Sequence, residues 1–443
     1  MKILWLCNLI LPRAGEQLGI EGIPKEGWVE GLLHAMEPLL GGHDIAVAFP
    51  VSEEYDGKRG TFKISDESEV SVSFFCFYED TVHPENMDPL LVSRMNRILD
   101  EFRPDVIHIF GTEFPHARAM ASAVCEDDFH YHPGSGRLFV TFQGICSAIA
   151  ADYMACLPDS VVSSATFRDT VKKDSIKQQQ EKFRARAVNE LEAVKLAGHV
   201  GGRTSFDRKW GKRFSPDAVY HHAGEIMRPL FYEPLPEEIK RDMNTIFVSG
   251  ADYPLKGFHI LLTAVKDLNW PELKIRVAGQ DIVTKKTLKD KVKISEYGRY
   301  LGSLIKEYGL EDKVTFLGRI GAAEMREEYL KCGMYICPSS VENSPNSIVE
   351  ASLCMAPVIA AKVGGIPDII RDKKECLLYE CNARKPMEEV AANLRKCIEA
   401  VLLDPESALQ RSALARERML KDNDPRAVSS EIMAVYSEMC KED

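Results

Sequence analysis

The feature that most constrains the fold of this chain is its alternation of short, apolar, β-rich runs with helical stretches from one end to the other. Several of the runs are almost wholly apolar, as strands buried on both faces of a sheet are. The alternation predicts the α/β class, with a parallel sheet covered by helices on both faces. In the first half, strands are expected at residues 2–8, 44–51, 70–77, 106–111, 138–142, 199–201 and 218–221, and helices near 28–40, 86–102, 115–125 and 170–197.

The length of the chain predicts two such domains. A chain of 443 residues exceeds the size at which one hydrophobic core stops growing. The Pro- and Glu-rich stretch 228–243 is interpreted as a linker between domains at 1–227 and 244–424, and residues 425–443 as a helix that packs back on the first domain. Two doubly wound, Rossmann-like domains bind ligands at the carboxyl ends of their strands, so the cleft between them is the expected active site. Strands of the second domain are expected at 245–249, 273–278, 313–317, 334–338, 357–361 and 375–379.

Composition and charge narrow the classes of function. The net charge of −11 argues against a nucleic-acid-binding protein whose whole surface attracts phosphate. The 12 cysteines form no CxxC pair and no zinc-type cluster, which favours a reducing, cytoplasmic compartment. The opening MKILWLCNLILP is interpreted as a strand rather than a signal peptide, because Asn8 interrupts its apolar stretch. No segment approaches the ~20 apolar residues of a membrane helix, so any membrane contact is expected to be peripheral.

The most informative motif is the strand–loop–helix–strand segment MYICPSSVENSPNSIVEASLCMAPVIAAKVGGIPD at 334–368. Ser344 has the chemistry of an N-cap and Pro345 suits the first position of a helix, which predicts a helix start with free N–H groups. Such an end attracts an anion, and the diphosphate of a nucleotide sugar has the required charge. Glu342 before the cap and Glu350 in the second turn can accept hydrogen bonds from sugar hydroxyls. The alternative, a solvated acidic loop before an ordinary helix, leaves the polar, proline-bearing start unexplained.

This motif resembles that of the retaining GT-B glycosyltransferases of glycosyltransferase family 4, which carry a pair of glutamates in an E-x7-E pattern in the same setting. The resemblance extends along most of the chain and implies a GT-B fold, with an acceptor-side domain followed by a nucleotide-sugar-binding domain. It implies that Glu342 touches the donor sugar and that Glu350 holds the ribose hydroxyls. The segment between them would receive the phosphates, through Asn343, Ser344, Pro345, Asn346 and Ser347.

Lys256, which ends the loop in SGADYPLKGFHILLTAV, resembles the lysine with which the family neutralises the departing diphosphate. The family often has an arginine five residues earlier, where this chain has Ala251. Arg203 is a candidate replacement for that donor-binding cation. The alternative, an Arg203 that forms a salt bridge with Asp207, is equally open.

Three further positions belong to the expected N-terminal half of the site. Gly27, before Trp28, resembles the glycine-rich turn of the family that approaches the donor phosphates. Gln143 in TFQGI stands where the family often has a histidine, so a neutral amide is expected beside the transferred sugar and no general base is assigned there. Glu113 and His116 follow a predicted strand and are candidate acceptor contacts.

The resemblance thus implies an enzyme that moves a hexose-type sugar from a UDP- or GDP-type donor to a hydroxyl of a glycan or lipid-linked acceptor. Capsule or exopolysaccharide synthesis is the expected setting, without a cofactor or a catalytic metal. The acidic clusters at 126–128 and 422–424 are rejected as a metal site. The basic stretch 169–188 predicts a solvated helix, with contact to the inner face of a membrane as the open alternative. Rival functions are a GT-B nucleotide-sugar epimerase or hydrolase, and an inactive nucleotide-sugar-binding module.

Overall fold

The protein divides into two compact units. The computed structural model describes residues 1–20, 27–125, 135–284 and 293–441. Unit 1 comprises residues 1–147, 183–228 and 423–443, and unit 2 comprises residues 148–182 and 229–422. Each unit has a parallel sheet and helices of its own, so the expected α/β class with two Rossmann-like domains is confirmed.

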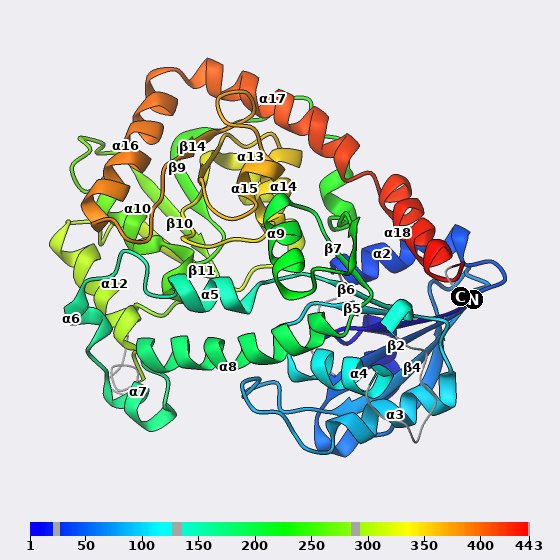
Figure 1. The fold of residues 1–443 in the computed structure, drawn as a ribbon. Coiled ribbons are helices and arrows are strands. Elements are labelled where there is room, and N and C mark those ends of the chain that lie inside the picture. The colour runs from blue at the N-terminus through cyan, green and yellow to red at the C-terminus, as the bar shows by residue number, and fades with distance from the viewer. Residues whose placement is uncertain (21–26, 126–134, 285–292, 442–443) are drawn as a thin grey trace. The chain divides into compact units, whose positions relative to one another are not determined.

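Unit 1 contains a sheet in the order β3-β4-β2-β1-β5-β6-β7-β8 (Figure 1). Apart from β3, which runs antiparallel to β4, neighbouring strands are parallel. The order reverses direction at β1, as in doubly wound folds that bind ligands at such a switch point. The strands are β1 (Lys2–Leu6), β2 (Asp44–Val51), β3 (Arg59–Lys63), β4 (Ser71–Tyr78), β5 (Val106–Phe110), β6 (Leu138–Thr141), β7 (His199–Gly202) and β8 (Val219–His222).

Helices cover this sheet, and the last of them is tied to its centre by buried hydrogen bonds. In Figure 1, α18 at the red end of the chain lies beside α2, and the two are in contact. Tyr436 of α18 accepts a bond from Trp5 Nε1 at 3.0 Å and lies 2.6 Å from His108 Nδ1. Burial keeps the pKa of His108 well below its usual value, so its ring is neutral. The helices within unit 1 are α1 (Pro12–Leu18), α2 (Trp28–Met36), α3 (Leu91–Phe102), α4 (Pro115–Cys125), α9 (Ser205–Phe214) and α18 (Pro425–Met439). Two more helices, α5 (Cys146–Asp152) and α8 (Ile176–Lys195), each contain residues of both units.

Unit 2 contains a parallel sheet in the order β11-β10-β9-β12-β13-β14. Numbered within the unit, this is 3-2-1-4-5-6, the Rossmann order with its switch point between the first and fourth strands. The strands are β9 (Asp242–Val248), β10 (Lys274–Ala278), β11 (Val314–Gly318), β12 (Cys332–Cys337), β13 (Val358–Ala361) and β14 (Leu377–Tyr379). The helices are α6 (Asp159–Val162), α7 (Phe167–Lys172), α10 (Phe258–Val265), α12 (Glu296–Glu307), α13 (Ala322–Lys331), α14 (Asn346–Leu353), α15 (Ile366–Ile369), α16 (Met387–Leu403) and α17 (Pro405–Asp422).

The structure corrects two expectations. Residues 148–182 were assigned to the N-terminal domain, but they belong to unit 2, where Thr166 Oγ1 donates to the Ile294 carbonyl at 2.7 Å and Asp169 accepts from Glu296 N at 2.8 Å. Strand β3 was not predicted. It is a short, polar edge strand with only Phe62 buried, so it lacks the apolar run that marked the other strands.

Candidate active site

The switch point of the unit 2 sheet brings together a lysine and a glutamate that the sequence places 86 residues apart. Lys256 lies in the loop after β9, and Glu342 lies in the loop after β12, the neighbouring strand. Lys256 Nζ donates to Glu342 Oε1 at 2.8 Å. The side chains are 32% and 15% exposed, so the pair is open to a ligand yet shielded from bulk water. The two strongest candidates from the sequence therefore form one ion pair.

Neighbouring groups fix the geometry and charge of this pair. Ser339 Oγ, which is buried, donates to the same oxygen, Glu342 Oε1, at 2.7 Å. The negative charge of Glu342 raises the pKa of Lys256, against the opposing effect of burial. Lys256 is consequently an ammonium ion at any physiological pH. Sequence reasoning missed Ser339, because a serine in a polar loop carries no local signal of its partner.

Two glycines let the backbone of three loops converge at Glu342. Gly257 has φ of +65°, and a Cβ there would lie 1.9 Å from the Pro338 carbonyl oxygen. Gly364 has φ of +52°, and a Cβ there would lie 1.8 Å from the Glu342 carbonyl oxygen. That carbonyl also accepts a hydrogen bond from Gly365 N at 3.1 Å. Only glycine fits both positions, so the loops after β9, β12 and β13 form a rigid backbone cradle.

The start of α14 lies directly after Glu342 in the chain, one residue later than expected. Pro345 occupies the N-cap position and Asn346 is the first helical residue, rather than Ser344 and Pro345 respectively. The reason is the backbone of Pro345, which is extended at ψ of 114° and so precedes the helix. The positive end of the helix still follows the loop of Glu342, where it favours an anion. Asn343 is buried, whereas Ser344 is partly exposed.

Buried hydrogen bonds from the neighbouring strand β12 fix the start of α14. The Tyr335 hydroxyl of β12 lies 2.8 Å from Ser249 Oγ, at the end of β9, and also bonds to Ser347 in the first turn of α14. Glu350 follows Asn346 by four residues, so the two lie on one face of α14. Glu350 is 7% exposed. The glutamate pair of the motif thus divides into a loop carboxylate beside Lys256 and a helix carboxylate one turn into α14.

Arg203 lies in unit 1 and forms an ion pair that the sequence did not predict. Its Nη2 is 3.2 Å from Glu225 Oε2, and both side chains are buried. Asp207, the partner considered from the sequence, instead caps α9: its carboxylate accepts from the backbone N–H groups of Arg203 and Thr204, each at 2.9 Å. Ala251 in unit 2 is buried, so its position offers no cation to a ligand.

Gln143 is hydrogen-bonded to Glu225, the glutamate that also pairs with Arg203. Its Nε2 donates to Glu225 Oε1 at 2.9 Å, and both residues line a small pocket of unit 1 with Trp28 and Phe110. Gly27 is the N-cap of α2, next to Trp28, and a Cβ there would meet no atom within 4 Å. Among the described residues of unit 1, no contact therefore demands a glycine at this position.

The two candidate acceptor contacts differ in accessibility. Glu113 follows β5 and packs between two turns, because a Cβ on Gly111 would lie 2.4 Å from its Oε2 and one on Gly144 would lie 3.0 Å from its Oε1. Burial raises its pKa. His116 is 1% exposed, and its Nδ1 lies 2.6 Å from Glu79 Oε2. Glu113 is half-buried, whereas His116 is buried. The burial of His116 disfavours direct contact with a sugar and leaves Glu113 as the stronger candidate.

A second buried carboxylate of unit 1, Glu190 of α8, had no signal in the sequence. It accepts hydrogen bonds from Cys146 N at 2.8 Å and from Ser147 N at 3.0 Å, at the start of α5, and from Thr112 Oγ1 at 3.1 Å. Burial raises the pKa of Glu190 to about 7. A glutamate inside a charged helix is normally solvated, so only tertiary structure reveals this role.

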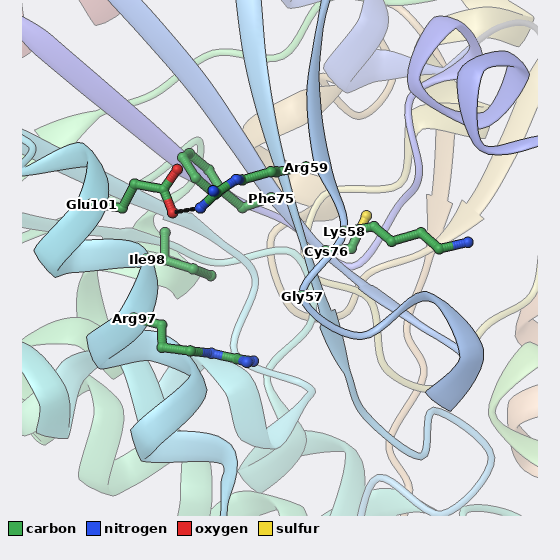
Figure 2. Close-up of a pocket in the computed structure, with 8 residues that line it drawn as sticks. All are labelled: Gly57, Lys58, Arg59, Phe75, Cys76, Arg97, Ile98 and Glu101. Carbon is green, nitrogen blue, oxygen red and sulfur yellow. Dashed lines mark hydrogen bonds and ion pairs between the residues drawn. The ribbon is translucent and has the colours of Figure 1, made fainter.

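A cavity of about 320 Å³ in unit 1, between β3, β4 and α3, is not a comparable anion site (Figure 2). Figure 2 shows Arg59 directed at Glu101, with which it forms an ion pair. Arg97 lies 3.4 Å from Asp56, and the Lys58 ammonium lies 4.1 Å from the centre of the Tyr55 ring. Two of the three cations that line this cavity, Arg59 and Arg97, are thus paired with carboxylates. Its wall consists of Gly57, Lys58, Arg59, Phe75, Cys76, Arg97, Ile98 and Glu101.

The described residues contain no group of three or more His, Cys, Asp or Glu side chains arranged to hold a metal ion. Of the two rejected acidic clusters, 126–128 lies outside the described residues. In the other, Asp424 caps α18 through Ala427 N at 2.9 Å and Asp422 pairs with Arg418 at 2.6 Å. Among the described helices, none combines the length and apolar composition that a membrane-spanning helix requires.

Residues 234–418 match the family model of the glycosyl transferases group 1. The chain is similar to the gpi3 subunit of phosphatidylinositol N-acetylglucosaminyltransferase of Schizosaccharomyces pombe, at 27% identity over 31% of this chain and 28% of that protein. It is also similar to a D-inositol 3-phosphate glycosyltransferase of Mycobacterium sp. (strain KMS), at 32% identity over 28% of this chain and 26% of that protein. The matched region thus spans less than a third of the length of these curated relatives.

Solved structures resemble the whole chain in fold. Sucrose-phosphate synthase from Thermosynechococcus elongatus has a TM-score of 0.69 at 15% identity, with 100% of both chains covered. Anabaena HepE in complex with UDP-glucose has a TM-score of 0.63 at 17% identity, with 99% of this chain and 100% of that chain covered. The fold of this chain is therefore the GT-B fold.

Proposed function

We propose that this chain, whose residues 234–418 match the family model of the glycosyl transferases group 1, moves a hexose-type sugar from a nucleotide-diphosphate sugar to a hydroxyl of a glycan or lipid-linked acceptor. The observation that carries the proposal is the Lys256–Glu342 ion pair at the switch point of the unit 2 sheet, directly before the start of α14. A partly exposed cation, a carboxylate and a helix N-terminus in one cradle suit a ligand that is a diphosphate at one end and a sugar at the other.

Donor binding follows from the charges of this site. The diphosphate binds at the first turn of α14, around Asn346 and Ser347, because the helix end has a partial positive charge. Lys256 has three N–H donors, so it can hold Glu342 and a phosphate oxygen at the same time. Glu350, on the same helix face as Asn346, accepts hydrogen bonds from the ribose hydroxyls. A UDP- or GDP-type donor meets these requirements, and a UDP-glucose complex of the similar HepE supports that choice.

Lys256 gains importance during transfer. As the bond between the anomeric carbon and the phosphate oxygen breaks, negative charge grows on the departing diphosphate, and a fixed ammonium stabilises it without reorganisation. Glu342 holds the sugar and keeps Lys256 in place. The hydrogen bonds of Lys256 and Ser339 to Glu342 fix both members of the ion pair, which limits the rearrangement that opposes the reaction.

Retention of configuration is the proposed outcome at the anomeric carbon. The acceptor oxygen forms its bond on the face that the phosphate leaves, and the acceptor proton passes to the departing phosphate oxygen. Gln143 is a neutral amide already bonded to Glu225, which suits a role in holding a hydroxyl rather than in removing its proton. Capsule or exopolysaccharide assembly as the setting stays a prediction.

Turnover of the variants Lys256→Ala and Glu342→Gln tests the site. Each is expected to lower kcat about 10² to 10³-fold, the usual loss when one preorganised electrostatic contact is removed. A matched control is Lys362→Ala, since Lys362 lies after β13 in the same unit and pairs with Glu380 at the surface. The donor is first chosen by thermal shift against UDP-, GDP- and ADP-sugars, because a ligand at 100 times its Kd stabilises by about 2.7 kcal/mol.

Three outcomes would contradict the proposal. Unchanged kcat in both variants would show that Lys256 and Glu342 do not form the active site. Donor consumption at full rate without an acceptor, giving a free sugar or an epimer, would indicate a hydrolase or an epimerase. Donor binding with no turnover across a broad acceptor panel would indicate a binding module. Nuclear magnetic resonance of the product separately tests retention at the anomeric carbon.

A further inference from the structure

Two cysteines of unit 2, Cys156 and Cys381, lie side by side although 225 residues separate them in the chain. Cys156 lies between α5 and α6, and Cys381 lies two residues after β14 ends at Tyr379. The two thiols form a hydrogen bond with each other. Cys156 Sγ also lies 3.9 Å from the Asn382 carbonyl oxygen, so two contacts fix it against this loop.

This arrangement differs from that of cysteines that act as small apolar side chains. Cys332, for example, is fully buried, and its thiol donates to the carbonyl of Tyr329 in the last turn of α13. Cys156 is 7% exposed, but Cys381 is half-buried and so accessible to a small solute. Cys156 also has φ of +58°, a left-handed conformation that is strained for a residue other than glycine. The surrounding structure holds this sulfur where it is.

The contact between the two sulfurs favours ionisation of one thiol over the other. The hydrogen bond from Cys381 lowers the pKa of Cys156, because it favours the charged sulfur. The pKa of Cys381 rises for the same reason, since it donates that bond. A thiolate next to a second, resolving thiol is the arrangement of redox-active cysteines, and reactivity follows the thiolate.

We propose that Cys156 and Cys381 are a modification site, at which a peroxide forms a reversible disulfide. One thiolate attacks a peroxide oxygen, the O–O bond breaks, and the sulfur becomes a sulfenic acid while the departing hydroxide takes a proton to form water. The second thiol attacks that sulfur, the S–S bond forms and the S–O bond breaks, with release of a second water. Two thiols are thus oxidised by two electrons and one peroxide is reduced. A dithiol reverses the reaction by thiol–disulfide exchange.

The cross-link would fasten residues 148–182 to the carboxyl end of β14. The Tyr379 hydroxyl, two residues before Cys381, donates to the Pro338 carbonyl at 3.3 Å, at the start of the loop that contains Glu342. The bond therefore closes beside the loop of the ion pair. The formation of the disulfide does not depend on the proposed transferase activity, and either proposal can fail without the other.

Mass spectrometry of the native full-length chain tests this site. The protein is freed of reductant, treated with an equimolar amount of hydrogen peroxide, alkylated and digested without reduction. We expect residues 138–168 and 375–384 to be joined, with the loss of two hydrogen atoms, and separated again by dithiothreitol. Trypsin leaves Cys146 with Cys156 and Cys376 with Cys381, so fragmentation of the joined peptides must assign the sulfurs.

Variants complete the test. Cys156→Ser and Cys381→Ser should each abolish the cross-link, whereas Cys376→Ser, the matched control on the same peptide, should retain it. Hydrogen exchange in residues 148–182 should slow after oxidation of the unsubstituted protein and not after oxidation of Cys381→Ser. The proposal is overturned if the two cysteines stay separately alkylatable, become sulfinic acids, or join other cysteines instead of each other. The cross-link in the unsubstituted protein alone is decisive if a variant fails to fold.

Discussion

In both units, carboxylates lie in or contact the loops that follow sheet strands, but the two units hold them in different ways. In unit 2, Glu342 is partly exposed and pairs with Lys256, which is more exposed still, inside a cradle whose shape depends on glycine backbone. In unit 1, Glu190 and Glu225 are buried and bonded to groups from distant parts of the chain. The first arrangement leaves paired charges partly exposed, whereas the second uses buried charge to join elements. Steric fit should therefore dominate the stability of the unit 2 site, and buried polar bonds that of unit 1.

The largest expected loss of stability tests whether steric fit determines the stability of the unit 2 site. Gly364→Ala places a Cβ 1.8 Å from the Glu342 carbonyl oxygen at a φ of +52°, so the loops after β12 and β13 must separate. We expect a loss of more than about 5 kcal/mol in the free energy of unfolding of unit 2, because backbone blocks backbone. Hydrogen exchange of the peptides that contain β12 and β13 measures this loss.

The control for Gly364→Ala is Gly309→Ala. Gly309 has φ of +63°, and a Cβ there would meet no atom within 4 Å, so the variant has the backbone strain without the collision. It should cost only about 1 kcal/mol. Equal effects in the two variants would mean that strain, and not the convergence of loops on Glu342, determines the stability of the cradle.

The same contrast explains how much could be predicted from the sequence. The fold and the loop–helix form of the Glu342–Glu350 segment could be predicted, because short apolar runs and a polar helix start are local sequence patterns. Ser339, Glu190 and Glu225 were not, since each owes its role to a partner that local sequence does not specify. Arg203 illustrates the limit: the sequence suggested its neighbour Asp207, but that carboxylate is used by the cap of α9. Residues 148–182 were misassigned for a related reason, because no change in composition marks where the chain crosses between units.

The next largest expected loss of stability tests whether buried hydrogen bonds determine the stability of unit 1. Tyr436→Phe removes the hydroxyl that bonds to Trp5 Nε1 and His108 Nδ1 and leaves two buried groups without that partner. At about 1 to 3 kcal/mol for each unsatisfied group, we expect a loss of about 4 kcal/mol in the stability of unit 1. Urea unfolding followed by tryptophan fluorescence reports it, because Trp5, Trp28 and Trp210 lie in unit 1.

Tyr379→Phe provides the matched change in unit 2. Its hydroxyl makes one long bond of 3.3 Å to the Pro338 carbonyl, so its removal should cost about 1 kcal/mol. A larger loss of unfolding free energy for Tyr379→Phe than for Tyr436→Phe would mean that buried hydrogen bonds stabilise unit 2 more than unit 1.

The last of the three main effects, smaller than those of Gly364→Ala and Tyr436→Phe, depends on pH and concerns Glu190. Burial raises its pKa to about 7 from the ordinary value of 4.5, so the folded protein binds this proton more tightly than the unfolded chain. The stability that comes from this proton is complete below the unfolded pKa of about 4.5 and is lost as pH rises through about 7. Between pH 5 and pH 8, unit 1 should therefore lose about 2 kcal/mol relative to Glu190→Gln, which has no proton to release.

Urea unfolding at several pH values measures that difference. Glu192→Gln is the control, because Glu192 lies on the same helix and pairs with Lys195 at the surface. Glu190→Gln also loses part of a hydrogen bond to the start of α5, but that loss does not change with pH, so the slope separates the two effects. A flat difference between pH 5 and pH 8 would mean that Glu190 stays ionised in the fold. Its hydrogen bonds from Thr112, Cys146 and Ser147 would then outweigh burial. The buried carboxylate of unit 1 would in that case resemble Glu342 in charge and differ from it in exposure.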